Sequence, residues 1–240
     1  MLASGHCSVA APQYLAPGVY RVDALSFSNL ISVLLLENDD GWTLVDTGVD
    51  GSVERIEEAL ASLGSGPRDL KRIFITHQHD DHTGGLKRLL EWAPHVEVGA
   101  SEHEARVISG ELPYDPSDNR FVRFMTRNAQ PPGIPVAQTL DEGDLVSGFR
   151  VICTPGHTPG HVSLLRDADG LLFTADAFGR LPRKLRVGLI KAFCADPPMA
   201  KQSAHKLLRE EFAMVILAHG PVMRSGGREK LQRAIDRCRY

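Results

Sequence analysis

The sequence predicts an α/β domain, because short apolar runs alternate with amphipathic segments of helical length along most of its 240 residues. A second observation is a weak internal repeat: each half of the chain contains a strand ending in Asp, then a helix, then a strand ending in His. A third is that histidine and aspartate gather where predicted strands end. Together these observations indicate sheets and helices whose polar residues meet at one edge.

The predicted strands are apolar and bounded by glycine, proline or aspartate. They cover residues 19–22, 30–36, 42–45, 73–75, 96–99, 149–153, 162–165, 171–174 and 214–217. The predicted helices cover residues 52–63, 85–92, 102–109, 200–212 and 227–237. Ser52 is suited to start the first helix and Gly64 to end it. Because no shift in composition divides the chain, we expect a single domain over residues 1–240.

The internal repeat places chemically similar residues at matching positions. In the first half, Asp46 ends one strand and His77 ends the strand that follows the helix. In the second half, Asp176 and His219 take these places. Two such units facing each other would bring their polar strand ends together, although a chance similarity between common strand patterns is the alternative.

The composition is that of an ordinary globular protein, with 42% hydrophobic and 24% charged residues and a formal net charge of -3. This balance gives no reason to expect nucleic acid or a membrane surface as a partner. Residues 1–16 lack the basic and apolar regions of a secretory signal, so we expect a cytoplasmic protein. The four cysteines are widely spread and include no C-x-x-C pair, which argues against a disulfide framework.

The segment 76–82, with the sequence T-H-Q-H-D-D-H, predicts a metal site. Neutral imidazole is the commonest protein ligand for metals, and imidazole with carboxylate suits zinc. An apolar strand precedes the segment, and Thr-Gly-Gly follows it, so we expect a tight turn that opens a helix. His77 and His79 would point to nearly opposite sides of a helix but can converge from a loop. The alternative is a polar loop with unrelated histidines.

Three further elements have matching chemistry. A loop with the sequence T-P-G-H-T-P-G-H contains His157 and His161, and its proline and glycine favour a rigid turn. Asp176 and His219 each follow a strand. Any one of these elements would be weak evidence, but the combination is specific.

The order of these motifs, from V-D-T-G at Asp46 to His219, resembles that of the metallo-β-lactamase-fold superfamily. The resemblance implies an α/β fold built as a four-layer αββα sandwich of two similar halves, with a dinuclear metal site at one edge. It implies two sets of metal ligands, a bridging ligand and a supporting aspartate. These are His77, His79 and His157 for the first ion; Asp81, His82 and His219 for the second; Asp176 as the bridge; and Asp46 behind the ligands.

Two neighbouring polar residues take other roles in this interpretation. His161 is expected behind the ligands or in the pocket wall, rather than on the metal. Asp80 occupies a variable position of the cluster, so we expect it to be solvated or to cap a helix.

The resemblance further implies a metal-dependent hydrolase. Two divalent ions, expected to be zinc with iron or manganese as alternatives, would share a bridging hydroxide that attacks a carbonyl carbon. Asp81 and Asp176 are the expected catalytic residues, because either could handle the proton. The substrate would be a small ester, thioester or lactone, since Asp at position 176 resembles the glyoxalase II and lactonase type of site. The lactonase tyrosine that should follow Asp176 is absent, and the substrate and the oligomeric state, a homodimer being one option, stay open.

Other functions remain to be distinguished. An oxidoreductase resembling the persulfide dioxygenases would keep most of these motifs but use one iron. A phosphodiesterase resembling the tRNA-processing branch is disfavoured by the negative net charge. A non-catalytic binding protein is disfavoured because no ligand position is lost. Segment 101–138 is either a lid or a surface excursion, and the basic segment 180–191 either a rim for an anionic substrate or a solvated face.

Overall fold

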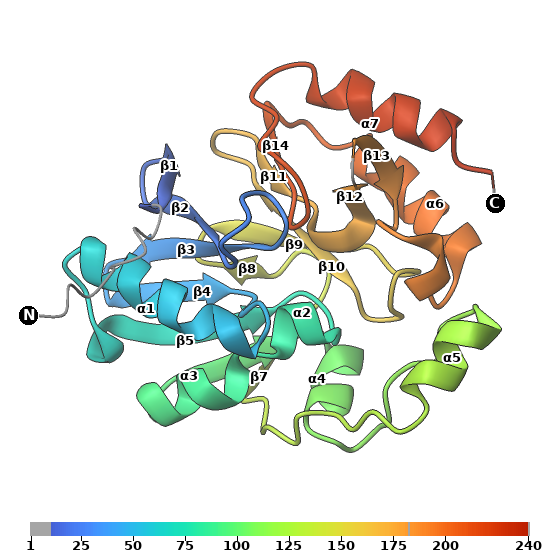
Figure 1. Ribbon diagram of the computed structural model, residues 1–240. Coiled ribbons are helices and arrows are strands. Elements are labelled where there is room, and N and C mark those ends of the chain that lie inside the picture. Colours follow the sequence, from blue (N-terminus) through green and yellow to red (C-terminus); the bar gives the residue numbers. More distant parts are fainter. Residues whose placement is uncertain (1–10, 182, 240) are drawn as a thin grey trace, which may run out of the picture.

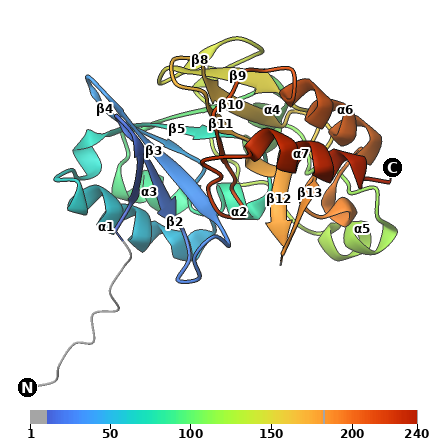
Figure 2. The same ribbon diagram turned by 90° about the horizontal axis from the view of Figure 1, so that it is seen from above.

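Two mixed β-sheets form the centre of the molecule, and helices cover the outer face of each (Figures 1 and 2). The computed structural model describes residues 11–181 and 183–239. Residues 1–10, 182 and 240 lie outside the described residues. Most of the N-terminal segment 1–16 and one position of the basic segment 180–191 are therefore not described. Among the described residues, no helix is long and apolar enough to cross a membrane.

The first sheet follows the order of the chain, from β1 to β7. Its strands are β1 (Gln13–Ala16), β2 (Val19–Asp23), β3 (Ser32–Asn38), β4 (Gly41–Val45), β5 (Leu70–Ile75), β6 (Glu97–Ala100) and β7 (Gln138–Thr139). The pairs from β1 to β4 are antiparallel, and those from β4 to β7 are parallel. The parallel strands β4 and β5 therefore end at the same edge of the sheet.

The second sheet has the order β14-β11-β10-β9-β8. Its strands are β8 (Leu145–Val146), β9 (Phe149–Cys153), β10 (Val162–Arg166), β11 (Leu171–Phe173) and β14 (Met214–Ile216). Only β11 and β14 pair in parallel within this described sheet. A separate hairpin consists of β12 (Phe178–Leu181) and β13 (Lys184–Val187).

The helices lie in two groups, with one helix apart from both (Figure 2). They are α1 (Val53–Ser62), α2 (Asp80–Thr83), α3 (Leu86–Trp92), α4 (Glu102–Ile108), α5 (Arg120–Thr126), α6 (Pro197–Leu207) and α7 (Gly227–Asp236). Helices α1 and α3 cover the first sheet, α6 and α7 cover the second, and α5 lies beside the layers.

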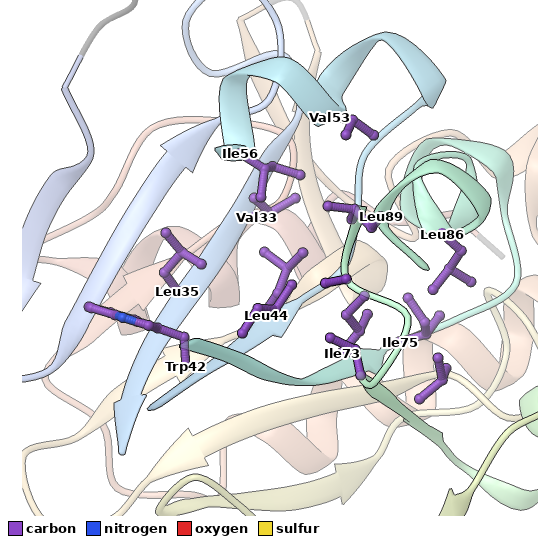
Figure 3. Packing of buried hydrophobic residues seen from close by; sticks show 14 of the residues in the cluster. Val33, Leu35, Trp42, Leu44, Val53, Ile56, Ile73, Ile75, Leu86 and Leu89 are labelled. Atoms are coloured by element: carbon purple, nitrogen blue, oxygen red, sulfur yellow. The ribbon is translucent and has the colours of Figure 1, made fainter. Parts of the chain in front are cut away.

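The alternation of side chains along the strands creates the layers. Leu34 and Leu36 of β3 enter the core between the two sheets, whereas Val33 and Leu35 face helices α1 and α3. Figure 3 shows the core between the first sheet and helices α1 and α3, one cluster that contains Leu35 of β3, Ile56 of α1 and Leu89 of α3. The second sheet alternates in the same way, since Val151 enters the core between the sheets and Ile152 that of α6 and α7. The predicted αββα fold is confirmed.

The internal repeat corresponds to two β-α-β units with parallel strands. In the first, Val45 pairs with Phe74, and in the second, Phe173 pairs with Ile216. The second helix begins and ends earlier than the predicted range 200–212. It begins at Pro197 because the carboxylate of Asp196 accepts the backbone N–H of Met199 at 2.9 Å. Helix α5, the hairpin and the short strands β1, β7 and β8 were not predicted.

Candidate metal centre

The strand ends carry the predicted ligands to one edge of the sandwich. Asp46 follows β4 and segment 76–82 follows β5, while Asp176 follows β11 and His219 follows β14. The two sheets are joined at this edge, because the backbone N–H of Val162 donates to the carbonyl of Thr76 at 3.2 Å. The structure thereby brings all seven predicted ligands together in three overlapping groups.

The first group consists of His77, His79 and His157, whose donor atoms lie within 4.8 Å of one another. Nε2 of His157 lies 2.9 Å from Nδ1 of His79. A zinc ion with nitrogen ligands at ~2.0–2.1 Å in a tetrahedron separates those nitrogens by about 3.3 Å. The spacing is therefore close to that of imidazoles arranged around one ion.

The second group consists of Asp81, His82 and His219. Nε2 of His219 lies 3.2 Å from a carboxylate oxygen of Asp81 and 3.4 Å from Nε2 of His82. Asp176 stands between the two groups. Its Oδ2 is 3.3 Å from Nε2 of His157, and its Oδ1 is 3.3 Å from Nε2 of His219. Each oxygen of this carboxylate thus faces a different group, as a bridging ligand requires.

Two buried atoms of the site lack hydrogen-bond partners, which tests whether the residues fit a metal. Nε2 of His77 and Oδ1 of Asp176 have none among the described atoms. Leaving a buried polar atom unsatisfied costs about 1–3 kcal/mol, so such atoms are rare in folded proteins. Both atoms belong to residues of the donor groups, and coordination to a metal would satisfy them. The residues present therefore fit the group that the sequence implies.

Asp46 supports the ligands from behind. Its Oδ2 accepts a hydrogen bond from Nδ1 of His82 at 2.8 Å, which leaves Nε2 of that ring for a metal. Its Oδ1 accepts the backbone N–H of Thr76 at 2.8 Å, next to His77. Asp46 adopts a φ of 61°, a left-handed conformation in which Asp is enriched. One buried carboxylate thus orients two parts of the histidine cluster.

His161 supports the bridging aspartate. Its Nε2 accepts the backbone N–H of Asp176 at 3.1 Å, and its Nδ1 lies 2.8 Å from the hydroxyl of Thr154. Ala175 precedes Asp176 with a φ of 42°, a conformation that costs energy in a residue with a Cβ atom. His161 therefore holds the backbone of a strained turn in place.

Backbone and sulfur groups orient two other ligands. Nδ1 of His219 donates to the carbonyl of Leu30 at 2.5 Å, so its Nε2 faces the site. Nδ1 of His157 lies 3.6 Å from Sγ of Cys194, which donates in turn to the carbonyl of Gly188 at 3.4 Å. Sequence reasoning did not find Leu30 or Cys194, because no local pattern marks either residue.

The charge states of the histidines differ between the two donor groups. Burial lowers the pKa values of His77 and His157 well below the usual range, so both rings are neutral, which is the ligating form. Burial acts in the opposite direction on Asp176, but the neighbouring His219 and His82 hold its pKa well below the usual range. The first group thus combines neutral imidazoles with the ionised carboxylate of Asp176. In the second group, burial acts to lower the pKa values of His82 and His219, but the adjacent carboxylates raise them, that of His219 to about 10. Both of these rings would release a proton on binding a metal.

A cleft of about 470 Å³ opens over these residues. Its floor contains His79, Asp81, His157, Asp176 and His219, and its walls are mainly apolar. The wall residues include Leu30, Ile31, Val49, Val122, Ala129, Leu189, Ile190 and Phe193. No lysine or arginine lines this cleft in the described part of the chain.

Segment 101–138 forms one wall of the cleft through residues 114–129. The hydroxyl of Tyr114 donates to the carboxylate of Asp80 at 2.9 Å, so Asp80 contacts this wall rather than simply being solvated. Asp115 donates its backbone N–H to Oε1 of Gln78 at 2.9 Å and contacts His103 at 2.7 Å. Gln78 and Asp80, which lie between metal ligands in the sequence, therefore connect this wall of the cleft to the metal-binding segment.

The basic segment does not form a rim over the metal residues. Arg180, Arg183 and Lys184 line a different cleft, on the side of the hairpin that faces α7. The interpretation of this segment as a rim for an anionic substrate is therefore not supported for these three residues.

Fold and site together define a metallo-hydrolase-like αββα protein with a histidine- and aspartate-rich centre. A family model described as Metallo-beta-lactamase superfamily matches residues 29–233. The chain belongs to this superfamily.

Similar proteins agree with this assignment. The chain is 30% identical to "Probable metallo-hydrolase YflN" of Bacillus subtilis over 85% of its own length and 84% of that protein. It is 38% identical to a hydroxyacylglutathione hydrolase of Alkalilimnicola ehrlichii, but over 53% of its own length and only 39% of that protein. Among solved structures, the metallo-beta-lactamase family protein TTHA1429 of Thermus thermophilus has a TM-score of 0.70 at 23% identity, covering 93% of this chain and 80% of that one. This last likeness concerns the fold.

Proposed function

We propose that the protein is a dinuclear, zinc-dependent hydrolase of a small ester, thioester or lactone with an apolar acyl group. The observation that carries the proposal is the convergence of seven donor residues, five of which form the floor of an apolar cleft. The names of two relatives, a probable metallo-hydrolase and a hydroxyacylglutathione hydrolase, support the reaction class. When bound, two zinc ions would supply a nucleophile from water near neutral pH and polarise the substrate carbonyl.

Asp81 is the better placed of the two proposed catalytic carboxylates for moving a proton to the leaving group. Its side chain is 35% exposed and lines the cleft, whereas that of Asp176 is 3% exposed. Burial alone would raise the pKa of Asp81, but the adjacent His82 and His219 hold this pKa well below the usual range. Asp81 is therefore ionised and accessible, and Asp176 mainly bridges.

The cleft walls support an uncharged, apolar acyl group. A volume of about 470 Å³ is within the range of small-molecule sites. Val122 and Ala129 from the segment around α5 line the same cleft as Ile190 and Phe193. Burying each methylene group contributes about 0.8 kcal/mol, or roughly a fourfold gain in affinity.

The experiment is a panel of esters, thioesters and lactones with acyl chains of two to ten carbons, assayed with the zinc-loaded protein. We expect hydrolysis whose kcat/KM rises up to about fourfold with each methylene group until the cleft is filled. Val122→Ser should flatten this dependence, because Val122 lines the cleft. Phe124→Ser on the same helix is the matched control, since Phe124 is 60% exposed and lies outside the cleft lining.

Two outcomes would contradict the proposal. If the zinc-loaded protein hydrolysed no member of the panel, hydrolysis of esters, thioesters and lactones would be ruled out as its function. Activity on a persulfide with iron bound would favour the dioxygenase alternative.

A further inference from the structure

A second cleft, of about 420 Å³, lies between the β12–β13 hairpin and helix α7. These elements lie side by side at one end of the second sheet (Figures 1 and 2). None of the seven metal-site residues lines this cleft. It is therefore separate from the proposed catalytic site.

The cleft is lined by six cationic side chains and no acidic one. Both walls contribute to this set, which is Arg180, Arg183 and Lys184 from the hairpin, Lys230 and Arg233 from α7, and Arg237 directly after α7. The last three are spaced by three and four positions, and Arg237 keeps a right-handed helical backbone, so they share one face of the helix and its end. The concentration is unusual in a chain whose net charge is -3.

These cations are not neutralised by neighbouring side chains. Within residues 11–181 and 183–239, no ion pair joins any of the six to a carboxylate, and the only side-chain hydrogen bond is from Lys230 to the carbonyl of Ser225 at 3.3 Å. Like charges held in a concave site repel one another. A polyanion bound there would relieve this repulsion.

The floor of the cleft is apolar. It consists of Leu185, Leu217, Pro221, Val222 and Met223. A neighbouring cleft of about 570 Å³ shares Lys184, Leu185 and Arg237 with the first and has three further cations and one carboxylate, that of Asp236. The surface therefore offers both an apolar face and an extended row of positive charges, at the scale of a small molecule.

We propose that this basic cleft binds a nucleoside polyphosphate, whose phosphates contact the arginine and lysine side chains and whose base packs on the apolar floor. Arginine suits this role because its planar guanidinium group pairs with phosphate oxygens through two hydrogen bonds. The proposal is independent of the reaction at the metal centre.

The experiment is isothermal titration of the metal-loaded protein with ATP, tripolyphosphate and adenosine at low ionic strength. We expect ATP to bind at least fivefold more tightly than tripolyphosphate, and both to weaken as salt is raised. The double variant Arg233→Glu/Arg237→Glu should weaken ATP binding at least tenfold. Arg68→Glu/Lys87→Glu is the charge-matched control, since both residues are exposed and lie outside the cleft lining, and it should bind ATP as the parent does.

A third variant separates this cleft from the metal centre, because phosphates can also ligate zinc. ATP binding should survive in His157→Ala/His219→Ala, which removes a ligand from each donor group and whose folding is checked by its melting temperature. Loss of binding in that variant, or equal losses in the two charge-reversal variants, would overturn the proposal. Equal affinities for ATP and tripolyphosphate, or tighter binding of a single-stranded oligonucleotide than of ATP, would overturn the assignment of a nucleotide ligand.

Discussion

Nδ1 of His82 donates a hydrogen bond to Oδ2 of Asp46 at 2.8 Å, and both side chains are only 1% exposed. The pair fixes the ring so that Nε2 faces Asp81, Asp176 and His219. A carboxylate behind a ligating imidazole also raises its basicity. The orientation of the His82 ring in the second donor group therefore depends on Asp46, which is not itself one of the donor residues.

Replacing the carboxylate of Asp46 should selectively lower the affinity for the second metal ion. Asp46→Asn keeps the shape, the left-handed backbone and one oxygen that can accept the backbone N–H of Thr76, but it loses the charged acceptor of His82. We expect a 10–100-fold lower affinity for one of two ions, measured by chelator competition. Asp40→Asn, at an exposed ion pair with Arg72, is the control and should change neither affinity. Equal weakening of both ions would contradict the assignment of His82 to one group.

Replacing His161 should instead affect both ions, since it holds the bridging Asp176. His161→Phe keeps a ring but leaves the backbone N–H of Asp176 without its acceptor, which costs about 1–3 kcal/mol. The same chelator competition should show both affinities lowered. Loss of only one ion would mean that Asp176 does not bridge.

Glu104 gives a prediction for the pH dependence of stability. This buried carboxylate accepts the hydroxyl of Thr158 at 2.6 Å and the backbone N–H of Gly160 at 2.9 Å, and burial raises its pKa to about 7. The folded state thus keeps a proton that the unfolded chain releases near pH 4.5. The free energy of unfolding should therefore fall by up to about 3 kcal/mol as the pH rises from 4.5 to 7.

Glu104→Gln tests this sign, because glutamine mimics the protonated acid and cannot lose the proton. Urea unfolding of the metal-depleted proteins should show the variant gaining stability relative to the parent across that pH range. A difference that stays constant from pH 4.5 to 7.5 would contradict a protonated Glu104.

Tyr114 links the cleft wall to the metal-binding segment through its hydrogen bond to Asp80. Tyr114→Phe removes about 0.5–1.5 kcal/mol of stabilisation from that wall. We expect KM to rise roughly 2–10-fold while metal content stays unchanged. Tyr14→Phe, on exposed β1, is the control and should leave KM as it is. A variant that loses metal instead would assign Tyr114 to the stability of the site.

The sequence was sufficient for the strand ends and for the residues gathered there. Apolar runs such as 73–75 identify buried strands locally, and a histidine two or three residues after such a strand lies near the sheet edge. The hairpin β12–β13 was missed because arginine and lysine interrupt its apolar pattern.

Contacts between distant segments could not be predicted from the sequence, for a different reason. Tyr114 meets Asp80 across 34 positions, and Cys194 meets His157 across 37. Neither contact has a local signal, because it depends on how loops return over the sheet edge. Glu104 looked like an ordinary residue of helix 102–109, and only its burial against the Thr158 loop makes it unusual.

Metal content is the most direct test of the account. Protein purified without added metal should contain about two zinc ions per chain by mass spectrometry. His157→Ala and His219→Ala, each from a different donor group, should retain about one. About one iron per chain in the parent would contradict the dinuclear zinc centre, and no metal after reconstitution would show that these residues are not its ligands.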